Sequence, residues 1–135
     1  MVKGIGTDII EIDRIEKAIN REAFLTKMFH NREIDYFKMR NMKPEFIAGR
    51  FAAKEAIVKA LGTGFRGIKF KDIIVDRNSL GKPIVVLKGE AEKIASKYGE
   101  YTIHISISHG RDNAIAYAIW EVKNESFKGS INKGN

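Results

Sequence analysis

Residues Gly49 to Leu61 read Gly-Arg-Phe-Ala-Ala-Lys-Glu-Ala-Ile-Val-Lys-Ala-Leu, and this stretch decides the fold. It holds four alanines and no glycine or proline after Gly49, which predicts a helix. At 3.6 residues per turn, one face is broad and apolar and is formed by Ile47, Phe51, Ile57, Val58 and Leu61. The opposite face holds only small residues, namely Ala52, Ala53, Ala56 and Ala60. A helix with two such faces packs on two sides, so we expect it at the centre of the molecule.

Glu55 and Lys59 lie four residues apart on the strip between these two faces. The commonest meaning of this spacing is an exposed ion pair on a helix surface. A surface helix, however, has one continuous polar face, and here Lys54 stands in the middle of the large apolar face. We therefore expect Glu55 and Lys59 near the interior.

Length and composition indicate one compact domain. The chain has 135 residues, two prolines and 44% hydrophobic residues, which suits a single modest core over residues 1–123. Residues 124–135 are polar and are expected to form a flexible tail. The predicted fold class is α+β, with the long buried helix packed on a mostly antiparallel sheet that the first strand and two hairpins form.

Composition also restricts the chemistry. Without cysteine, any metal must be held by oxygen or imidazole. No apolar run approaches the roughly 18 residues of a membrane span, so we expect a cytoplasmic protein that binds no membrane. The formal net charge of +7 predicts an anionic partner, which by charge alone is a nucleic acid, a nucleotide cofactor or an acidic protein.

The first strand, expected over residues 2–11, carries Gly4-x-Gly6-x-Asp8. Because side chains alternate along a strand, the two glycines leave bare backbone on the same side as the Asp8 carboxylate, which a bulky group can then approach. The alternative is that Asp8 only caps the helix that follows. Spacing alone leaves both interpretations open.

One helix is expected from residue 12 to about residue 29. Its outer side carries Arg14 and Arg21, which lie one heptad apart and so form one stripe suited to an acidic helix. A short helix is expected at residues 31–39, and the segment at Pro44 separates it from the central helix.

The second half predicts two hairpins. Gly62, Thr63 and Gly64 end the central helix, and strands at 70–75 and 84–87 follow, joined by a long basic loop with Lys82 and Pro83. After a helix at 89–98, strands at 101–108 and 114–122 place His109 at an accessible turn. The run Ser106-x-Ser108-His109 lacks a nucleophile elbow and a triad order, which argues against a serine hydrolase.

Three motifs together resemble one family. Gly4-Ile5-Gly6-Thr7-Asp8, Gly49 to Ala60 and Ser106-x-Ser108-His109, in this order and at these intervals, resemble the holo-acyl-carrier-protein synthases, which are small bacterial phosphopantetheinyl transferases. The resemblance covers residues 2 to about 122. The loops Gly62-Thr63-Gly64 and Gly81-Lys82-Pro83 also match the family's loops.

The resemblance implies transfer of the 4′-phosphopantetheine arm of coenzyme A to a serine of acyl carrier protein in fatty acid biosynthesis. The other product is adenosine 3′,5′-bisphosphate. The resemblance also implies that the enzyme requires magnesium and forms a homotrimer with active sites at the subunit interfaces. Magnesium prefers hard oxygen ligands and keeps several waters, so two carboxylates and the phosphate oxygens suffice as its ligands. Candidates for the general base are a metal-bound water, Glu55 or another acid.

The same resemblance assigns roles to residues. Asp8 and Glu55 match the metal ligands, and Lys59 matches the lysine near the reacting phosphates, so Glu55 and Lys59 are the candidate catalytic pair. The positions around the nucleotide, besides Lys59, are matched by Arg50, Gly62, Thr63, Lys82, Pro83 and His109. Arg14 matches a carrier-protein contact, and Arg21 shares its stripe. Acidic carrier proteins also suit the positive net charge.

Two other classes of function compete with the enzyme. A small basic nucleic-acid-binding module would explain the net charge, but the basic residues are dispersed and no nucleic-acid motif is present. We therefore expect no nucleic-acid partner. A noncatalytic nucleotide-binding or scaffold domain would leave Asp8 and Glu55 without a metal.

Overall fold

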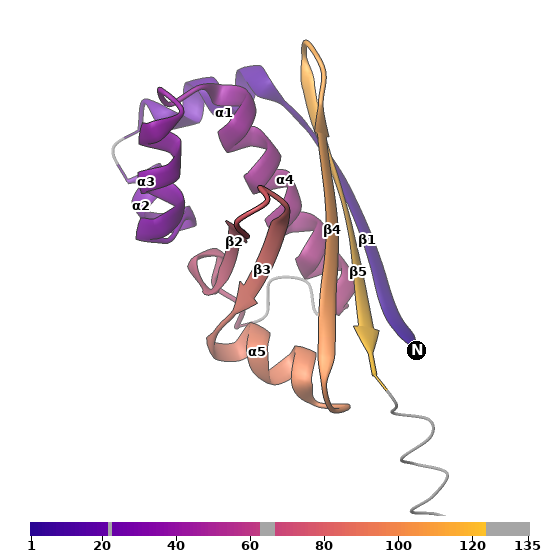
Figure 1. Cartoon of the computed structure of the whole chain (residues 1–135). Coiled ribbons are helices and arrows are strands. Elements are labelled where there is room, and N and C mark those ends of the chain that lie inside the picture. Colours follow the sequence, from indigo (N-terminus) through magenta and orange to yellow (C-terminus); the bar gives the residue numbers. More distant parts are fainter. Residues whose placement is uncertain (22, 63–66, 124–135) are drawn as a thin grey trace, which may run out of the picture.

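A computed structural model describes residues 1–21, 23–62 and 67–123. The structure contains, in chain order, β1 (Val2–Glu11), α1 (Ile12–Ile19), α2 (Phe24–Met28), α3 (Asn31–Met39), α4 (Pro44–Leu61), the 3-10 turn η1 (Phe70–Asp72), β2 (Ile73–Arg77), β3 (Pro83–Leu87), α5 (Gly89–Ser96), β4 (Tyr101–His109) and β5 (Asn113–Val122) (Figure 1). This is the α+β class that the sequence predicts. The tail predicted at 124–135 lies outside the described residues, and no helix within them is long and apolar enough to cross a membrane.

The strands form two antiparallel sheets. The larger has the order β1-β5-β4, so the last strand of the chain lies between the first strand and its own hairpin partner. β2 and β3 pair only with each other. The expectation that both hairpins join one sheet is therefore wrong: β3 packs near β4, but an open groove lined by residues of both strands lies between them.

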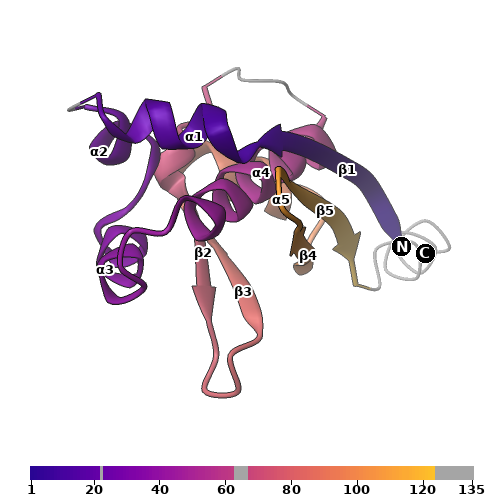
Figure 2. The same cartoon turned by 90° about the horizontal axis from the view of Figure 1, so that it is seen from above.

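Helix α4 lies between these parts, with the larger sheet on one side and the β2–β3 hairpin and α3 on the other (Figures 1 and 2). All four alanines of the small-residue face are buried, and the apolar face is buried except for Phe51, which is half-buried. The alanine face meets the two glycines of β1: a Cβ on Gly4 would lie 1.7 Å from the Ala60 carbonyl oxygen, and one on Gly6 would lie 1.9 Å from that of Ala56. Only glycine permits this approach, which brings the β1 backbone onto the helix.

The helix expected over residues 12–29 is wrong as one element. α1 ends at Ile19, and the backbone then turns, with the Asn20 N–H donating to Lys17 and the Arg21 N–H to Ala18. The apolar spacing explains the break: it lengthens to five residues between Ile19 and Phe24, so a continuous helix would turn Phe24 away from the core. As two helices, both segments pack inward.

The remaining predictions differ from the structure mainly at element ends. The first hairpin strand begins at Ile73, because residues 70–72 form η1. Gly62 ends α4 in the left-handed conformation, with φ of 75°, and its N–H donates to Val58 and Lys59. The second hairpin forms as predicted, with an exposed His109 at the end of β4.

Candidate active site

Asp8 and Glu55 converge where β1 packs on α4. Asp8 lies on the same face of β1 as Gly6, so its carboxylate points to the helix, where it forms a hydrogen bond with the Glu55 carboxyl group. The Lys59 ammonium donates to Asp8 Oδ1 at 3.2 Å and to the Thr7 carbonyl oxygen at 2.9 Å. Three side chains predicted from the sequence thus meet in one place.

This geometry decides between the interpretations that the sequence left open. Asp8 does not cap the following helix, because Glu11 occupies the N-cap position of α1 and makes no side-chain cap bond. The expectation that Glu55 and Lys59 lie near the interior is wrong for Lys59, whose side chain is 55% exposed, while Glu55 is half-buried. The ion pair of Lys59 is with Asp8, 51 residues away along the chain.

The two neighbouring carboxyl groups of Asp8 and Glu55 make this place suitable for binding a cation. Burial, followed by the nearby Asp8 carboxylate, raises the pKa of Glu55 to about 6, although Lys59 and Arg14 oppose the shift. Two carboxylates that compete for one proton also offer hard oxygen ligands to a divalent ion. Within the described residues no group of three or more His, Cys, Asp or Glu is placed to hold a metal, so two protein ligands would leave positions for water and substrate oxygens. The residues therefore fit magnesium.

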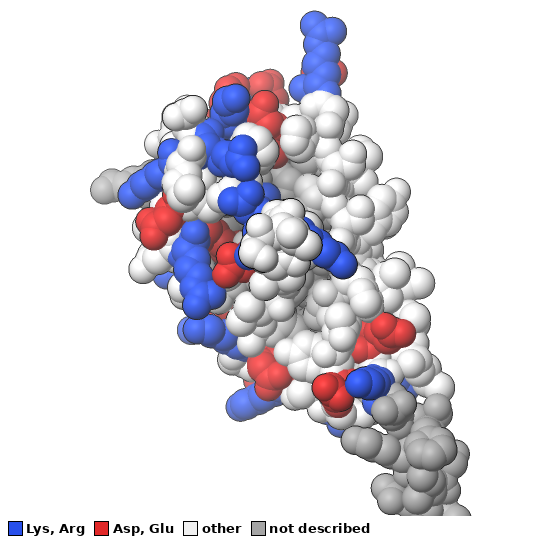
Figure 3. Space-filling view, in the orientation of Figure 1, with Lys and Arg blue, Asp and Glu red and all other residues white. Residues whose placement is uncertain are grey.

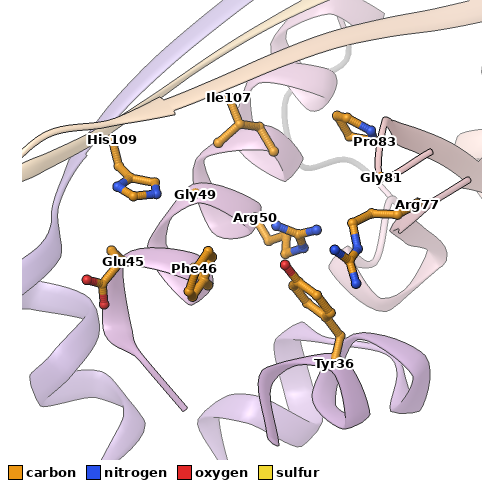
Figure 4. A pocket seen from close by; sticks show the side chains of 10 residues that line it. All are labelled: Tyr36, Glu45, Phe46, Gly49, Arg50, Arg77, Gly81, Pro83, Ile107 and His109. Carbon is orange, nitrogen blue, oxygen red and sulfur yellow. The ribbon is translucent and has the colours of Figure 1, made fainter. Parts of the chain in front are cut away.

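A second group of predicted residues lies elsewhere. Arg50, Pro83 and His109 line a pocket of about 190 Å³ with the unpredicted Tyr36 and Arg77; its other lining residues are Glu45, Phe46, Gly49, Gly81 and Ile107 (Figure 4). The His109 ring packs edge-on against Phe46, with centroids 5.8 Å apart. The sequence carries no local signal for Tyr36 or Arg77, because α3 and β2 reach this pocket only through the tertiary fold.

The two groups are not brought together within one chain. Arg50 and Lys59 are nine residues apart on α4, which places them about 180° apart around the helix axis. Gly62 follows Lys59 at the helix end, and Thr63 lies outside the described residues. Lys82 is exposed and, with Pro83, lines the groove between β3 and β4.

The predicted carrier-contact residues lie on the helical side of the molecule. Arg14 on α1 is close enough to Glu55 to oppose the rise in its pKa. Arg21 is exposed but lies beyond the end of α1, so the helical stripe that was expected to join it to Arg14 is wrong. In Figure 3, Lys and Arg gather over α3 and the β2–β3 hairpin, whereas the surface along β4 is mostly uncharged.

Comparison with known proteins now adds to this geometry. Residues 4–118 match the profile of the 4′-phosphopantetheinyl transferase superfamily, ACPS. The chain belongs to this superfamily. A holo-[acyl-carrier-protein] synthase of Clostridium novyi is 61% identical over 125 residues, which are 92% of this chain and 91% of that protein.

Solved structures of superfamily members support the same relationship. The holo-[acyl-carrier-protein] synthase of Neisseria meningitidis has a TM-score of 0.81 at 34% identity, and the match covers 90% of this chain and all of that one. The synthase of Bacillus anthracis, solved in complex with CoA (3′,5′-ADP), has a TM-score of 0.75 at 38% identity and coverages of 91% and 99%.

A third cavity adjoins Glu55. It has a volume of about 630 Å³, and Glu55 forms part of its wall together with Phe51, Ile68, Phe70, Met28 and Thr26 and the lysines 27, 69 and 71. The cavity is mainly apolar with basic residues at its edge. No local pattern in the sequence predicts this cavity, because residues of α2, α4 and η1 line it together.

A buried ion pair stands directly behind this cavity. The Lys54 ammonium donates to Glu33 Oε1 at 2.7 Å, to the Phe70 carbonyl oxygen at 2.8 Å and to that of Ile73 at 2.6 Å. Glu33 Oε2 accepts from the Val75 N–H at 3.2 Å. Lys54 thus ties α4 to α3, η1 and β2, next to Glu55 in the chain.

Proposed function

We infer that this chain acts as a phosphopantetheinyl transferase on acyl carrier protein. It transfers the 4′-phosphopantetheine group of coenzyme A to a serine of the apo-carrier, which gives holo-carrier protein and adenosine 3′,5′-bisphosphate, in fatty acid biosynthesis. The observation that supports this best is the meeting of Asp8, Glu55 and Lys59 where β1 packs on α4. The family membership and the coenzyme A complex of the related Bacillus anthracis synthase point to the same reaction.

We assign the metal site to Asp8 and Glu55. Magnesium, when bound there, supplies positive charge to the phosphate oxygens. The Lys59 side chain is 55% exposed, and its ammonium is available to donate a charge-assisted hydrogen bond to the phosphate that leaves. The apolar cavity beside Glu55 is suited to the uncharged pantetheine arm, because the phosphorus at its end must lie near Glu55.

We propose that two copies of the chain form each complete site, within a homotrimer. The reason is the separation on α4: a nucleotide held by Arg50, Pro83 and His109 faces away from Asp8 and Lys59 of the same chain. The outer face of the larger sheet also exposes large apolar side chains that a partner would cover, namely Ile5, Ile9, Tyr117 and Ile119. Light scattering should give a trimer mass at micromolar concentration, and an active monomer would contradict this assembly.

The test of the function is a direct one. The protein is incubated with coenzyme A, apo-carrier protein and magnesium, and the intact carrier is weighed by mass spectrometry. We expect the carrier to gain one phosphopantetheine group, and to gain none when the protein is omitted or magnesium is chelated. An unchanged carrier mass under all conditions would contradict the function. The cytoplasmic location stays a prediction.

A further inference from the structure

The cavity beside Glu55 combines an apolar interior with a positively charged edge. Its volume of about 630 Å³ lies within the range of sites that bind small molecules. Met28, Phe51, Ile68 and Phe70 form its apolar wall, and Ile68 and Phe70 are themselves buried, at 7% and 8% exposure. The Phe51 and Phe70 rings also contact each other, with centroids 5.5 Å apart. The wall is therefore packed in place before any ligand enters.

The charged residues at the edge of this cavity are mostly of one sign. Lys27 on α2 and Lys69 and Lys71 on either side of Phe70 are exposed and line the cavity. Among the described residues, Glu55 is the only acidic one that lines it. No ion pair between described residues involves any of the three ammonium groups. They are available to an anionic group that is attached to an apolar body.

The proposed reaction does not use these charges. The pantetheine arm is uncharged, so it would contact the apolar wall and leave the three lysines unpaired. A helix of a partner protein fits less well, because a helix binds in a groove along a row of apolar residues. Here residues of three separate elements surround the space instead. A single flexible hydrocarbon chain that ends in an anion uses both the apolar wall and the lysines.

The position of Glu55 fixes the direction in which such a chain binds. A carboxylate head group is attracted to the three ammonium groups and repelled by the Glu55 carboxylate. The head group therefore lies at the lysines, and the chain extends along the apolar wall toward Glu55. Each methylene group that leaves water strengthens binding by up to about fourfold.

We propose that this cavity is a regulatory site for a free fatty acid, with the carboxylate at the three lysines and the hydrocarbon chain against the apolar wall. The proposal rests on the proposed function, in which the carrier protein that this chain modifies serves fatty acid biosynthesis. A bound fatty acid excludes the pantetheine arm from the same space. The end product of the synthesis therefore inhibits the transfer in competition with coenzyme A.

The first experiment measures binding without catalysis. Octanoate, decanoate and dodecanoate are titrated into the wild-type protein by calorimetry, each below its micelle concentration. Decyltrimethylammonium is the matched ligand control, because it has the chain of decanoate with the opposite charge. We expect affinity to rise about two- to fourfold per methylene group, and the cation to bind about tenfold more weakly than decanoate. No binding of dodecanoate, or equal binding of the anion and the cation, would overturn the proposal.

The second experiment assigns the head group and the chain to different parts of the cavity. The double variant Lys69→Gln with Lys71→Gln should weaken all three fatty acids by the same factor, about 3- to 10-fold. Lys93→Gln with Lys97→Gln, two exposed lysines at α5, is the matched control and should change nothing. Thr26→Trp fills the cavity from an exposed position on α2, so it should weaken dodecanoate more than octanoate. Equal effects of the two lysine pairs, or a chain-length dependence that Thr26→Trp leaves unchanged, would overturn the proposal.

The third experiment measures inhibition in the transferase assay. Dodecanoate should raise KM for coenzyme A in proportion to its concentration and leave kcat unchanged. Binding of dodecanoate without a change in KM would overturn the competition with the pantetheine arm. If dodecanoate does not bind, and Thr26→Trp weakens binding of the apo-carrier, then the carrier protein occupies the cavity and the proposal is overturned.

The outcomes separate this inference from the proposed function. If no carrier gains phosphopantetheine but dodecanoate binds with the expected dependence on charge and chain length, the transferase function fails and the fatty acid site stands. If transfer is normal and dodecanoate does not bind, the site fails and the function stands. Thermal melting of each variant checks folding, and if Thr26→Trp does not fold, the comparison of the two lysine pairs decides.

Discussion

Lys54 and Lys59 lie five residues apart on one helix, yet their surroundings are opposite. The Lys54 side chain is fully buried, and its ammonium donates to Glu33 and to the Phe70 and Ile73 carbonyl oxygens. An ammonium has three N–H donors, so all of them are used. The Lys59 side chain is 55% exposed, and among the described residues its ammonium donates to Asp8 and Thr7. One lysine is completely satisfied by the protein, and the other retains a donor that solvent can reach.

This difference separates a structural charge from a functional one. Burial lowers the pKa of Lys54, and the Glu33 carboxylate opposes that shift, so the pair must stay together to remain charged. Lys59 is free to exchange a contact without leaving a buried charge behind. A charged group that acts on a substrate must be able to exchange its hydrogen-bond partner. A charged group that joins four elements of the fold must keep its partners.

The largest effect that we expect is on stability, from Lys54→Met. The variant leaves the Glu33 carboxylate and two carbonyl groups buried without their donor, which should lower the free energy of unfolding by about 3–5 kcal/mol. Urea denaturation measures it. Lys59→Met is the matched control and should change stability by less than about 1 kcal/mol while it lowers turnover. Similar unfolding midpoints for both variants would contradict the structural role of Lys54.

The next effect is on catalysis at Asp8 and Glu55, the proposed metal ligands. Asp8→Asn and Glu55→Gln keep the shape of each side chain but remove the charge that holds a cation, so turnover should fall by about 100-fold or more while the fold is retained. Excess magnesium should restore part of the activity. Turnover is measured against magnesium concentration, with circular dichroism as the control for folding. Variants with the wild-type rate and an unchanged magnesium midpoint would exclude both residues from the metal site.

A smaller effect is expected at the exposed arginines. Arg14→Glu and Arg21→Glu should each raise the Michaelis constant for carrier protein about tenfold and leave that for coenzyme A nearly unchanged, because they alter attraction to an acidic partner. Binding of the carrier should also weaken as salt rises. Lys93→Glu, an equal charge change on the distant helix α5, is the control. If it matches the arginine variants, net charge rather than this surface explains carrier capture.

The smallest effect concerns the pH dependence of stability. The pKa of Glu55 in the folded protein, about 6, lies above its ordinary value of 4.5, so the folded state binds this proton more tightly. The contribution is therefore fully present below about pH 4.5 and is lost as the pH rises through about 6. In metal-free buffer, Glu55→Gln should gain thermal stability relative to the wild type between pH 5 and pH 7. Melting curves with a chelator test this, and a constant difference between the two proteins would contradict the shift.

Much of the fold could be predicted from local spacing in the sequence, whereas the pairing of Asp8 with Glu55 was predicted only through the family resemblance of the motifs that contain them. The alanine face of α4 and the glycines at positions 4 and 6 of β1 are complementary in size, and this complementarity brings Asp8 to Glu55. The helical and strand periods also predicted which side of each element is buried. These periods depend on residues a few positions apart, which is why the sequence alone reveals them.

The tertiary structure alone decided the partners that lie far apart in the chain. Lys54 meets Glu33 21 residues away, and Arg50 meets Tyr36 and Arg77 only because α3 and β2 pack on the same side of α4. The sequence placed Lys54 on an apolar face and had no partner for it, and it placed Arg50, Lys59 and His109 around one nucleotide that a single chain does not surround. Which distant side chains meet depends on how whole elements pack, and no local period encodes that packing.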